Sequence, residues 1–184
     1  MFDSAHDLDA PSPWVCRWAG LIPAAGRVLD VACGHGRHLC YLRGRGFAVV
    51  GVDRDEAALG ALKGLAGAEL HVADIEAGPW PFPPESFDGV VVINYLYRPL
   101  FPKLIGALRR GGVLIYETFA AGNERYGRPS NPAFLLRRGE LLESVEPLSV
   151  IAFEQGLVAR PKPAVIQRVC ALRDGTEASP LDRQ

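Results

Sequence analysis

The segment that most constrains the fold covers residues 28–37 and has the sequence VLDVACGHGR. It begins with an apolar run interrupted only by Asp30, a pattern typical of a strand buried in a parallel sheet. Gly34 and Gly36 follow, and residues 38–43 continue as a helical segment, so the chain is expected to pass through a tight turn into a helix. Glycine allows close approach to the backbone, and the start of a helix offers unpaired N–H groups to an anion. We therefore expect this turn to bind a carboxylate or phosphate.

Short apolar runs alternate with helical segments along the rest of the chain. The expected strands are 28–33, 48–53, 68–73, 89–94 and 113–117, with two more near 149–153 and 165–171. Such alternation is typical of a mostly parallel sheet covered by helices. The chain has 184 residues, of which 48% are hydrophobic, enough for one substantial core. The sequence thus predicts a single α/β domain, 1–184, with a Rossmann-like, mostly parallel sheet, helices on both faces, and flexible ends at 1–12 and 175–184.

Prolines and capping residues indicate where helices begin and end. Pro13 and Pro99 suit first helical positions, and Asp55 can cap a helix that extends to Leu65. The helix that begins at Pro99 is expected to continue through Leu108 and to end at the glycine pair 111–112. Another helix is expected near 138–145. The proline-rich stretch 75–86 and the stretch 121–132, rich in Gly, Asn and Pro, are expected to be loops.

Charge and cysteine content narrow the possible partners. The formal net charge is −1 and the sequence pI is about 6.4, so no overall attraction to nucleic acid or to anionic membranes is expected. The four cysteines form no CxxC pair and no metal-ligand spacing, and no metal site is expected. The first residues lack a signal-peptide pattern, and no apolar run is long enough to cross a membrane. The sequence predicts a cytoplasmic protein for which nucleic acid is a disfavoured partner.

Acidic residues after successive strands indicate the kind of ligand. Asp30 provides negative charge for an ammonium group, while the nearby helix start suits a carboxylate, so an amino-acid ligand satisfies both. Asp53 ends the next expected strand and can accept hydrogen bonds from two ribose hydroxyls. Asp74 follows the third strand and can accept from an adenine amino group, beside the backbone of Ile75. Together these features favour an adenosyl ligand that carries an amino acid.

The order and spacing of these segments resemble the class I S-adenosylmethionine-dependent methyltransferases over roughly residues 14–173. The similarity includes the turn at 30–36, the acidic residues after the second and third strands, and the segments 87–94 and 108–115. Ala32 departs from the family, which more often has glycine there, and the Cys-Gly-x-Gly-Arg turn looks most like the small tellurite-resistance-type methyltransferases. The resemblance implies methyl transfer, S-adenosylmethionine as the cofactor, and a set of cofactor-binding residues: Asp30, Ala32, Gly34, Gly36, Arg37, Asp53, Arg54, Asp74, Ile75 and Asn94.

The methyl acceptor is expected to be a small molecule, with an anionic one favoured. Loops after the fourth and fifth strands form the ligand crevice of such sheets, and here they contain arginines that can hold an oxyanion. The expected substrate-binding residues are Tyr97, Arg98, Arg125, Tyr126 and Arg128. Each arginine has a simpler interpretation as a solvated charge or, for Arg98, as the partner of a neighbouring loop. No general base is evident, so no catalytic residue is assigned.

Other functional interpretations remain open. An NAD-dependent oxidoreductase would use the same kind of sheet, although its GxGxxG turn requires a small residue where this chain has Leu39. A domain that binds S-adenosylmethionine without catalysis, as an interaction protein, would have the same cofactor residues. Methylation of a macromolecule is disfavoured, because residues 94–97 lack the paired prolines of amino-methylating enzymes and no nucleic-acid module is evident. Asp74 and Asn94 also have structural alternatives, as turn or loop caps.

Overall fold

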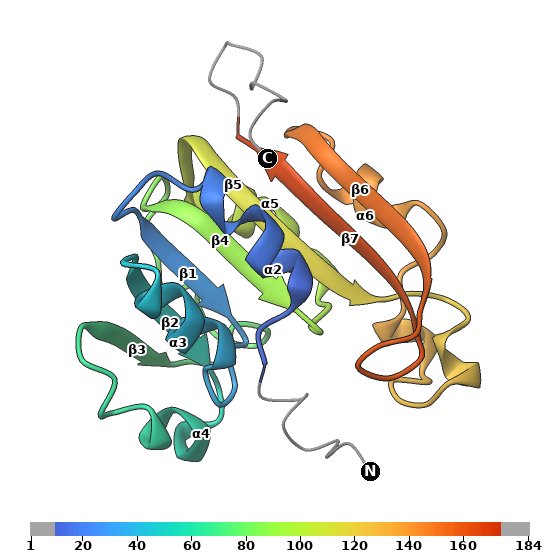
Figure 1. Cartoon of the computed structure of the whole chain (residues 1–184), viewed down its shortest axis with the longest axis horizontal. Helices are drawn as coiled ribbons and strands as arrows, with labels where there is room; N and C mark the ends of the chain where they lie inside the picture. The colour runs from blue at the N-terminus through green and yellow to red at the C-terminus, as the bar shows by residue number, and fades with distance from the viewer. Residues whose placement is uncertain (1–9, 174–184) are drawn as a thin grey trace.

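The apolar runs predicted as strands lie together in one sheet (Figure 1). The structure is a computed structural model that describes residues 10–173, and within them the sheet has seven strands in the order β3-β2-β1-β4-β5-β7-β6. The strands are β1 (Arg27–Val31), β2 (Ala48–Asp53), β3 (Ala68–Val72), β4 (Phe87–Ile93), β5 (Leu108–Phe119), β6 (Ser149–Val158) and β7 (Ala164–Leu172). Strands β1 to β5 are parallel, whereas β7 is antiparallel to both β5 and β6. The predicted α/β class is confirmed.

The helices cover both faces of this sheet. They are α2 (Pro13–Trp18), α3 (Arg37–Gly44), α4 (Glu56–Ala61), α5 (Phe101–Ala107) and α6 (Glu140–Ser144). Apolar side chains of α2, α3 and α4, such as Trp14 and Leu39, pack in one hydrophobic cluster. Those of α5 and α6, such as Leu104 and Leu141, pack in a second cluster. Because β1 and β4 contribute side chains to both clusters, these central strands are apolar along almost their whole length.

The last two strands form an antiparallel hairpin whose tip lies beside the carboxyl end of β5. Phe119, the last residue of β5, pairs with Ile166 near the start of β7. Residues 159–163 join β6 to β7, so this connection is held at the same edge of the sheet as the ends of the parallel strands. The strands near 149–153 and 165–171 are therefore confirmed, while their hairpin geometry adds a wall that the sequence pattern did not indicate.

Two helix boundaries differ from the prediction. The helix expected from Pro99 begins as a 3-10 turn, continues as α5 and ends at Ala107, because Leu108 is extended and pairs with Phe87 at the start of β5. The helix capped by Asp55 ends at Ala61 rather than at Leu65. The cap itself is present, since Asp55 Oδ1 accepts from the backbone N–H groups of the first helical turn at 3.0 Å. The stretch 75–86 contains neither helix nor strand, as its prolines predict.

The segment before α2 is fixed in place by Ser12. Its side chain is buried, the hydroxyl donates to Glu117 Oε1 at 2.9 Å, and the backbone N–H donates to Nε2 of His38 at 3.1 Å. The hydroxyl oxygen also accepts from the Trp14 N–H at 3.1 Å, which caps α2. These buried polar contacts connect Ser12, within the stretch 1–12 that is expected to be flexible, to α3 and β5. Residues 1–9 and 175–184 lie outside the described part of the chain.

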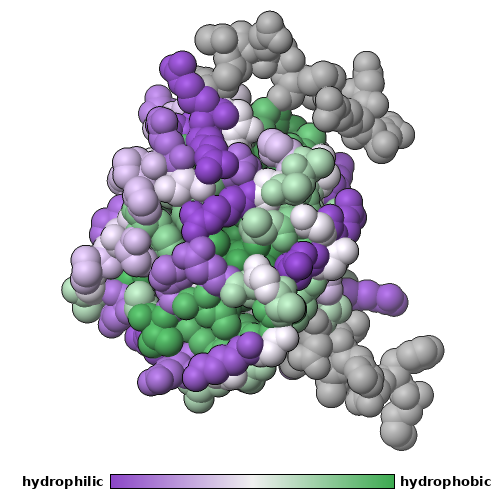
Figure 2. Space-filling view, turned by 90° about the vertical axis from the view of Figure 1, so that its left-hand side faces the viewer, coloured by the Kyte–Doolittle hydropathy of each residue, from purple (hydrophilic) through white to green (hydrophobic). Residues whose placement is uncertain are grey.

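The outer edge of the sheet at β3 is short and carries charge. Glu69 accepts from both Arg27 and His71 at 2.6 Å, while Val72 is 56% exposed. Figure 2, which looks onto this side of the molecule, shows hydrophobic residues gathered in the lower part of the face with hydrophilic residues around and across it. Charges on a short edge strand oppose pairing with another sheet. In residues 10–173, no helix combines the length and apolar character that crossing a bilayer requires.

Candidate functional site

The glycine turn after β1 is held open by a carboxylate at the end of β2. Ala32, Gly34 and Gly36 all have positive φ, at 53°, 51° and 74°. Asp53 Oδ2 accepts from the Gly34 N–H at 2.8 Å, and its Oδ1 accepts from the Asp55 N–H at 2.9 Å. The turn is therefore anchored to the neighbouring strand before any ligand binds. Glycine has no steric cost in this conformation, whereas Ala32 adopts it at some cost.

A cleft runs along the ends of β1 to β4, and we call it the strand-end cleft. It consists of two adjoining pockets of about 220 and 510 Å³ that share Ala32. Tyr95, Glu76 and Ala73 line the smaller pocket, while Cys33, His35, His38, Cys40 and Ile93 line the larger one. All but one of the residues predicted to bind the cofactor line the cleft. Those that line it are Asp30, Ala32, Gly34, Arg37, Asp53, Arg54, Asp74, Ile75 and Asn94. The exception is Gly36, which is the N-cap of α3.

Gly36 has a steric role. A β-carbon at this position would lie 2.5 Å from Cδ1 of Leu62, and φ is in the left-handed region. The residue therefore lets the chain turn into α3 closely packed against the segment after α4. Its predicted role in binding is indirect at most, since it shapes the turn rather than lining the cleft.

Asp30 is the most distinctive group in the cleft. It is 1% exposed, and its Oδ2 has no hydrogen-bond partner among the described residues. Burial raises the pKa of this carboxyl to about 8, while the nearby Arg37 guanidinium acts in the opposite direction. A buried carboxylate oxygen without a donor is costly, and an ammonium group supplied by a ligand would satisfy it. The geometry fits the amino group of an amino-acid ligand.

Asp74 caps the turn after β3. Its Oδ1 accepts from the N–H groups of Glu76 and Ala77, each at 3.0 Å, and these bonds lower the pKa of the exposed carboxyl. The structural alternative for Asp74 is therefore present. Because both bonds use Oδ1 and the residue lines the smaller pocket, it also remains available to a ligand there.

His38 lies at the base of the cleft and is buried. Its Nε2 accepts from the Ser12 N–H, and burial lowers the pKa of the imidazole to about 4. The ring is thus neutral at physiological pH and connects α3 to the segment before α2. His35, by contrast, is exposed at the rim.

A second cavity of about 610 Å³ opens next to the strand-end cleft, and we call it the arginine pocket. The arginine pocket and the larger pocket of the cleft are both lined by Arg37 and Asn94, so the two cavities adjoin at the carboxyl edge of the sheet. Walls come from the segment before α2, the ends of β4 and β5, the loop after β5 and the tip of the β6–β7 hairpin. The pocket contains five cationic side chains and a single carboxylate: Arg37, Arg128, Arg160, Lys162, Arg168 and Glu117.

The carboxylate and one of the cations neutralise each other. Arg168 Nη1 donates to Glu117 Oε2 at 3.2 Å, and its guanidinium also pairs with Glu154. The other oxygen of Glu117 accepts from Ser12. The Arg168 guanidinium lies 4.6 Å from the centre of the Trp14 ring. This set forms a fixed wall, and the remaining cations give the pocket its positive charge.

The residues predicted to bind substrate divide into two groups. Tyr126 and Arg128 line the arginine pocket, whereas Tyr97, Arg98 and Arg125 line neither this pocket nor the strand-end cleft. The Tyr97 hydroxyl donates to the backbone oxygen of Glu76 at 3.3 Å.

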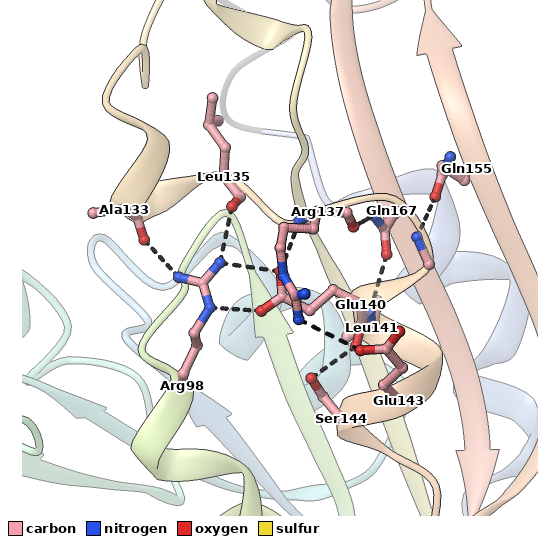
Figure 3. A network of polar contacts seen from close by, with 11 residues as sticks. Arg98, Ala133, Leu135, Arg137, Glu140, Leu141, Glu143, Ser144, Gln155 and Gln167 are labelled. Atoms are coloured by element: carbon pink, nitrogen blue, oxygen red, sulfur yellow. Dashed lines mark hydrogen bonds and ion pairs between the residues drawn. The ribbon is translucent and has the colours of Figure 1, made fainter.

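Arg98 belongs to a structural network (Figure 3). Its guanidinium donates to Glu140 at 2.6 and 3.1 Å and to the backbone oxygens of Ala133 and Leu135 at 2.8 and 2.9 Å. Arg98 uses its donors to hold segment 133–140. The structure therefore agrees with the simpler interpretation of Arg98, as the partner of a neighbouring loop, and does not place it at a substrate pocket. Buried Gln167 extends the network, because it donates to Arg137 O and accepts from the Leu141 N–H at 3.0 Å.

The sequence did not indicate the pocket residues contributed by the segment before α2 and by the tip of the β6–β7 hairpin. Ser12 lay in a segment expected to be flexible, and Arg160 and Lys162 lay between two short strands whose pairing was not predicted. The run Arg-Pro-Lys-Pro at 160–163 is the signal that could have identified the hairpin tip, since alternating cations and prolines mark an exposed, restricted turn. Within residues 10–173, no group of three or more His, Cys, Asp or Glu is arranged to hold a metal ion.

Comparison with known proteins relates this site to a family. Residues 28–112 match the model of a methyltransferase domain. A tRNA U34 carboxymethyltransferase of Shewanella denitrificans is 34% identical over 158 residues, which cover 72% of this chain and 48% of the relative. The enzyme of the same name from Tolumonas auensis is 32% identical over 160 residues, covering 73% and 48%. The chain thus spans about half the length of the curated relatives it matches.

Solved structures share the fold. TehB from Haemophilus influenzae has a TM-score of 0.73 at 18% identity and covers 87% of this chain and 61% of its own. An S-adenosylmethionine-dependent methyltransferase from Mesorhizobium loti has a TM-score of 0.71 at 18% identity and covers 88% and 99%. The comparisons correct one expectation. The expectation that the partner is a small molecule and that nucleic acid is disfavoured is wrong, because the curated relatives are named for a tRNA nucleoside.

Proposed function

Because the chain belongs to the class I S-adenosylmethionine-dependent methyltransferase family, we propose that it transfers the methyl group of this cofactor to a nucleotide of RNA. The observation that carries the proposal is that the strand-end cleft and the arginine pocket adjoin at Arg37 and Asn94, which line both. One cavity suits the cofactor, and the other suits an anionic acceptor beside it. Active sites of open α/β sheets lie at this carboxyl edge.

The larger pocket of the strand-end cleft suits the amino-acid part of the cofactor. The unpartnered Oδ2 of Asp30 would accept from the ammonium group, and the first N–H groups of α3 with the Arg37 guanidinium would bind the carboxylate. The α3 helix has eight residues, so its N-terminal groups carry a useful partial positive charge. Zwitterion recognition of this kind would fix the direction of the cofactor in the cleft.

The smaller pocket suits the adenosine part. Asp53 keeps lone pairs free beyond its two backbone bonds and would accept from the ribose hydroxyls. Asp74 and the backbone of Ile75 would contact the adenine edge, and Arg54 borders the same pocket. Ile75 is buried and would pack against the ring.

When bound, S-adenosylmethionine supplies an electrophilic methyl group on a sulfonium, and its departure leaves the neutral thioether S-adenosylhomocysteine. The task of the protein is to align the acceptor lone pair behind the methyl carbon and to exclude water. Proximity and orientation can lower such a barrier by about 7–11 kcal/mol. Arg37 and Asn94, at the junction of the two cavities, are the residues that would orient both partners. No described residue is assigned the role of general base.

An RNA acceptor is supported by the charge of the arginine pocket and by the relatives that act on tRNA. The formal net charge of −1 describes the whole chain and not this surface. A volume of about 610 Å³ is within the range of cavities that hold one small organic ligand, such as a single nucleotide. The cytoplasmic location expected from the sequence is part of this proposal.

The proposal is tested in two steps with the purified protein. Calorimetry should detect binding of S-adenosylmethionine and S-adenosylhomocysteine, and NADH should not compete. Incubation with methyl-deuterated cofactor and bulk bacterial tRNA, followed by digestion to nucleosides and mass spectrometry, should give a labelled nucleoside. Its mass identifies the transferred group and its base. Failure of the folded protein to bind either sulfur compound would refute the cofactor assignment, while cofactor binding without labelled RNA would refute the acceptor.

A further inference from the structure

Three cationic side chains of the arginine pocket have no partner within the described chain, unlike most of its arginines. Arg128, Arg160 and Lys162 are exposed, and within residues 10–173 they take part in no hydrogen bond or ion pair. By contrast, Arg98 and Arg168 are paired with carboxylates of neighbouring elements. Unpaired cations gathered on a protein of net charge −1 are available to bind an external anion.

These cations come from two loops that face the same cavity. Arg128 follows β5, and Arg160 and Lys162 lie at the tip of the β6–β7 hairpin. Pro161 and Pro163 flank Lys162, which restricts the backbone of the tip. The cations are therefore presented to one cavity by two separate segments of the chain, an arrangement suited to successive charges along one polymer.

An aromatic side chain lies beside them. Tyr126 is 47% exposed, an unusual position for a large ring, and it lines the same pocket. Its loop is rigid, since buried Asn123 donates to Pro129 O at 3.0 Å and accepts from the Val165 N–H at 3.2 Å. The base of the loop is closed by pairing of Ala120 with Leu136. An exposed ring on a fixed loop provides a flat surface for stacking.

We infer that the mouth of the arginine pocket binds single-stranded RNA on either side of the target nucleotide. Arg128, Arg160 and Lys162 contact the flanking phosphates, and one base stacks on Tyr126. The inference rests on the proposed function and specifies its substrate as RNA with an unpaired target. Alternating cations and aromatic rings are the usual means of binding a single strand, whereas bases inside a duplex cannot enter a pocket of about 610 Å³.

The phosphate contacts are tested by salt dependence. Fluorescence anisotropy with a labelled RNA hairpin, whose loop contains uridine, gives the dissociation constant at several KCl concentrations. In R128Q/R160Q/K162Q the slope of log affinity against log salt should decrease in magnitude by about 2, since each lost phosphate contact on a single strand accounts for about 0.7. The matched control K63Q/K103Q/R110Q removes the same charge from exposed positions outside the pocket and should keep the wild-type slope.

Stacking is tested at Tyr126. Tyr126→Phe keeps the ring and should retain wild-type RNA affinity, whereas Tyr126→Leu should weaken binding roughly 5- to 150-fold, the usual range for the loss of one stacked base. A blunt RNA duplex of the same length should bind more weakly than the hairpin. Equal affinity of the Leu and Phe variants, or preference for the duplex, would contradict the inference.

The experiment separates this inference from the proposed function. Every variant should fold, as judged by circular dichroism, and should bind S-adenosylhomocysteine with wild-type affinity. If the wild type methylates tRNA but the triple variant keeps the wild-type salt slope, the phosphate site is refuted and the proposed function stands. If the wild type binds S-adenosylhomocysteine but neither binds nor methylates RNA, the proposed acceptor is refuted together with the site.

Discussion

At the scale of single residues, Asp30 should couple ligand binding to the release of a proton, which can be measured. Burial raises its pKa to about 8, so the carboxyl is mostly protonated at pH 7 in the free protein. A ligand ammonium would favour the ionised form, and its binding should therefore release a proton. Calorimetry of S-adenosylhomocysteine binding at pH 7, in buffers with different ionisation enthalpies, should show release of about one proton.

Two variants, Asp30→Asn and Asp53→Asn, serve as controls for this calorimetric measurement. Asp30→Asn should bind the ligand more weakly and release no proton, because the amide does not titrate. Asp53→Asn should also bind more weakly but should still release most of the proton, because burial, the main cause of the raised pKa of Asp30, is kept and only the smaller contribution of the Asp53 charge is lost. Binding enthalpies independent of the buffer for the wild-type protein would show that Asp30 does not meet the ammonium group.

Asp53 has a second prediction, since it holds both the ligand and the turn. Asp53→Ala should weaken S-adenosylhomocysteine binding by about 1–3 kcal/mol, the usual cost of leaving polar groups unpaired. It should also lower the unfolding midpoint, because the Gly34 and Asp55 N–H groups lose their acceptor. Asp53→Asn retains one acceptor oxygen and should unfold at a temperature between those of the wild type and Asp53→Ala. An unchanged affinity in Asp53→Ala, measured by calorimetry, would contradict a ribose contact.

Residue roles were predictable where the partner is close in sequence or fixed by the order of strands. Asp30, Asp53 and the glycine turn follow from a strand that runs directly into a helix, and the structure places them in one cleft. For Arg98 the sequence left two interpretations open, a substrate contact or a neighbouring loop, and its partner Glu140 could not be identified because it lies far along the chain. Nothing in the local sequence distinguishes an arginine that holds a loop from one that holds a ligand.

At the scale of elements, the Arg98 network should stabilise the loop that carries Tyr126. Arg98→Ala leaves the buried carboxylate of Glu140 without its main partner, which should cost about 1–3 kcal/mol of unfolding free energy at pH 7. Because Arg98 and its hydrogen bonds lower the pKa of Glu140, this stabilisation is present above the unfolded-state pKa and is lost as the pH falls through the folded-state value.

Urea unfolding at pH 7 and at pH 3 tests this prediction. The difference in unfolding free energy between the wild type and Arg98→Ala should be larger at pH 7 than at pH 3. Affinity for S-adenosylhomocysteine should not change, since Arg98 lines neither cavity. A substrate-binding role would be indicated instead if the variant were as stable as the wild type and lost only methyl transfer.

Element positions were better predicted than element pairing. Every strand expected from the apolar runs is present, because a buried strand needs a local run of apolar residues. The direction of β7 and the hairpin it forms with β6 depend on contacts with β5 and are not encoded in either segment alone. That hairpin supplies Arg160 and Lys162, which explains why this part of the pocket wall was missed.

At the scale of the whole molecule, the distribution of charge matters more than its sum. A formal net charge of −1 led to the expectation that nucleic acid is a disfavoured partner. In the folded chain, ion pairs such as Arg109 with Asp88 and Arg173 with Glu85 neutralise much of the surface. The cations around the arginine pocket remain as a local positive region. Composition does not contain this information, because it depends on which charges find partners after folding.

The last prediction concerns the described chain as one cooperative unit. The sheet joins both hydrophobic clusters, since β1 and β4 contribute to each, so the cofactor cleft and the hairpin wall should unfold together. Calorimetric melting should show a single transition. S-adenosylhomocysteine at about 100 times its dissociation constant should add about 2.7 kcal/mol of stability and move the entire transition upward by several degrees. A second transition that does not move with ligand would show that the β6–β7 hairpin and its pocket fold separately from the cofactor site.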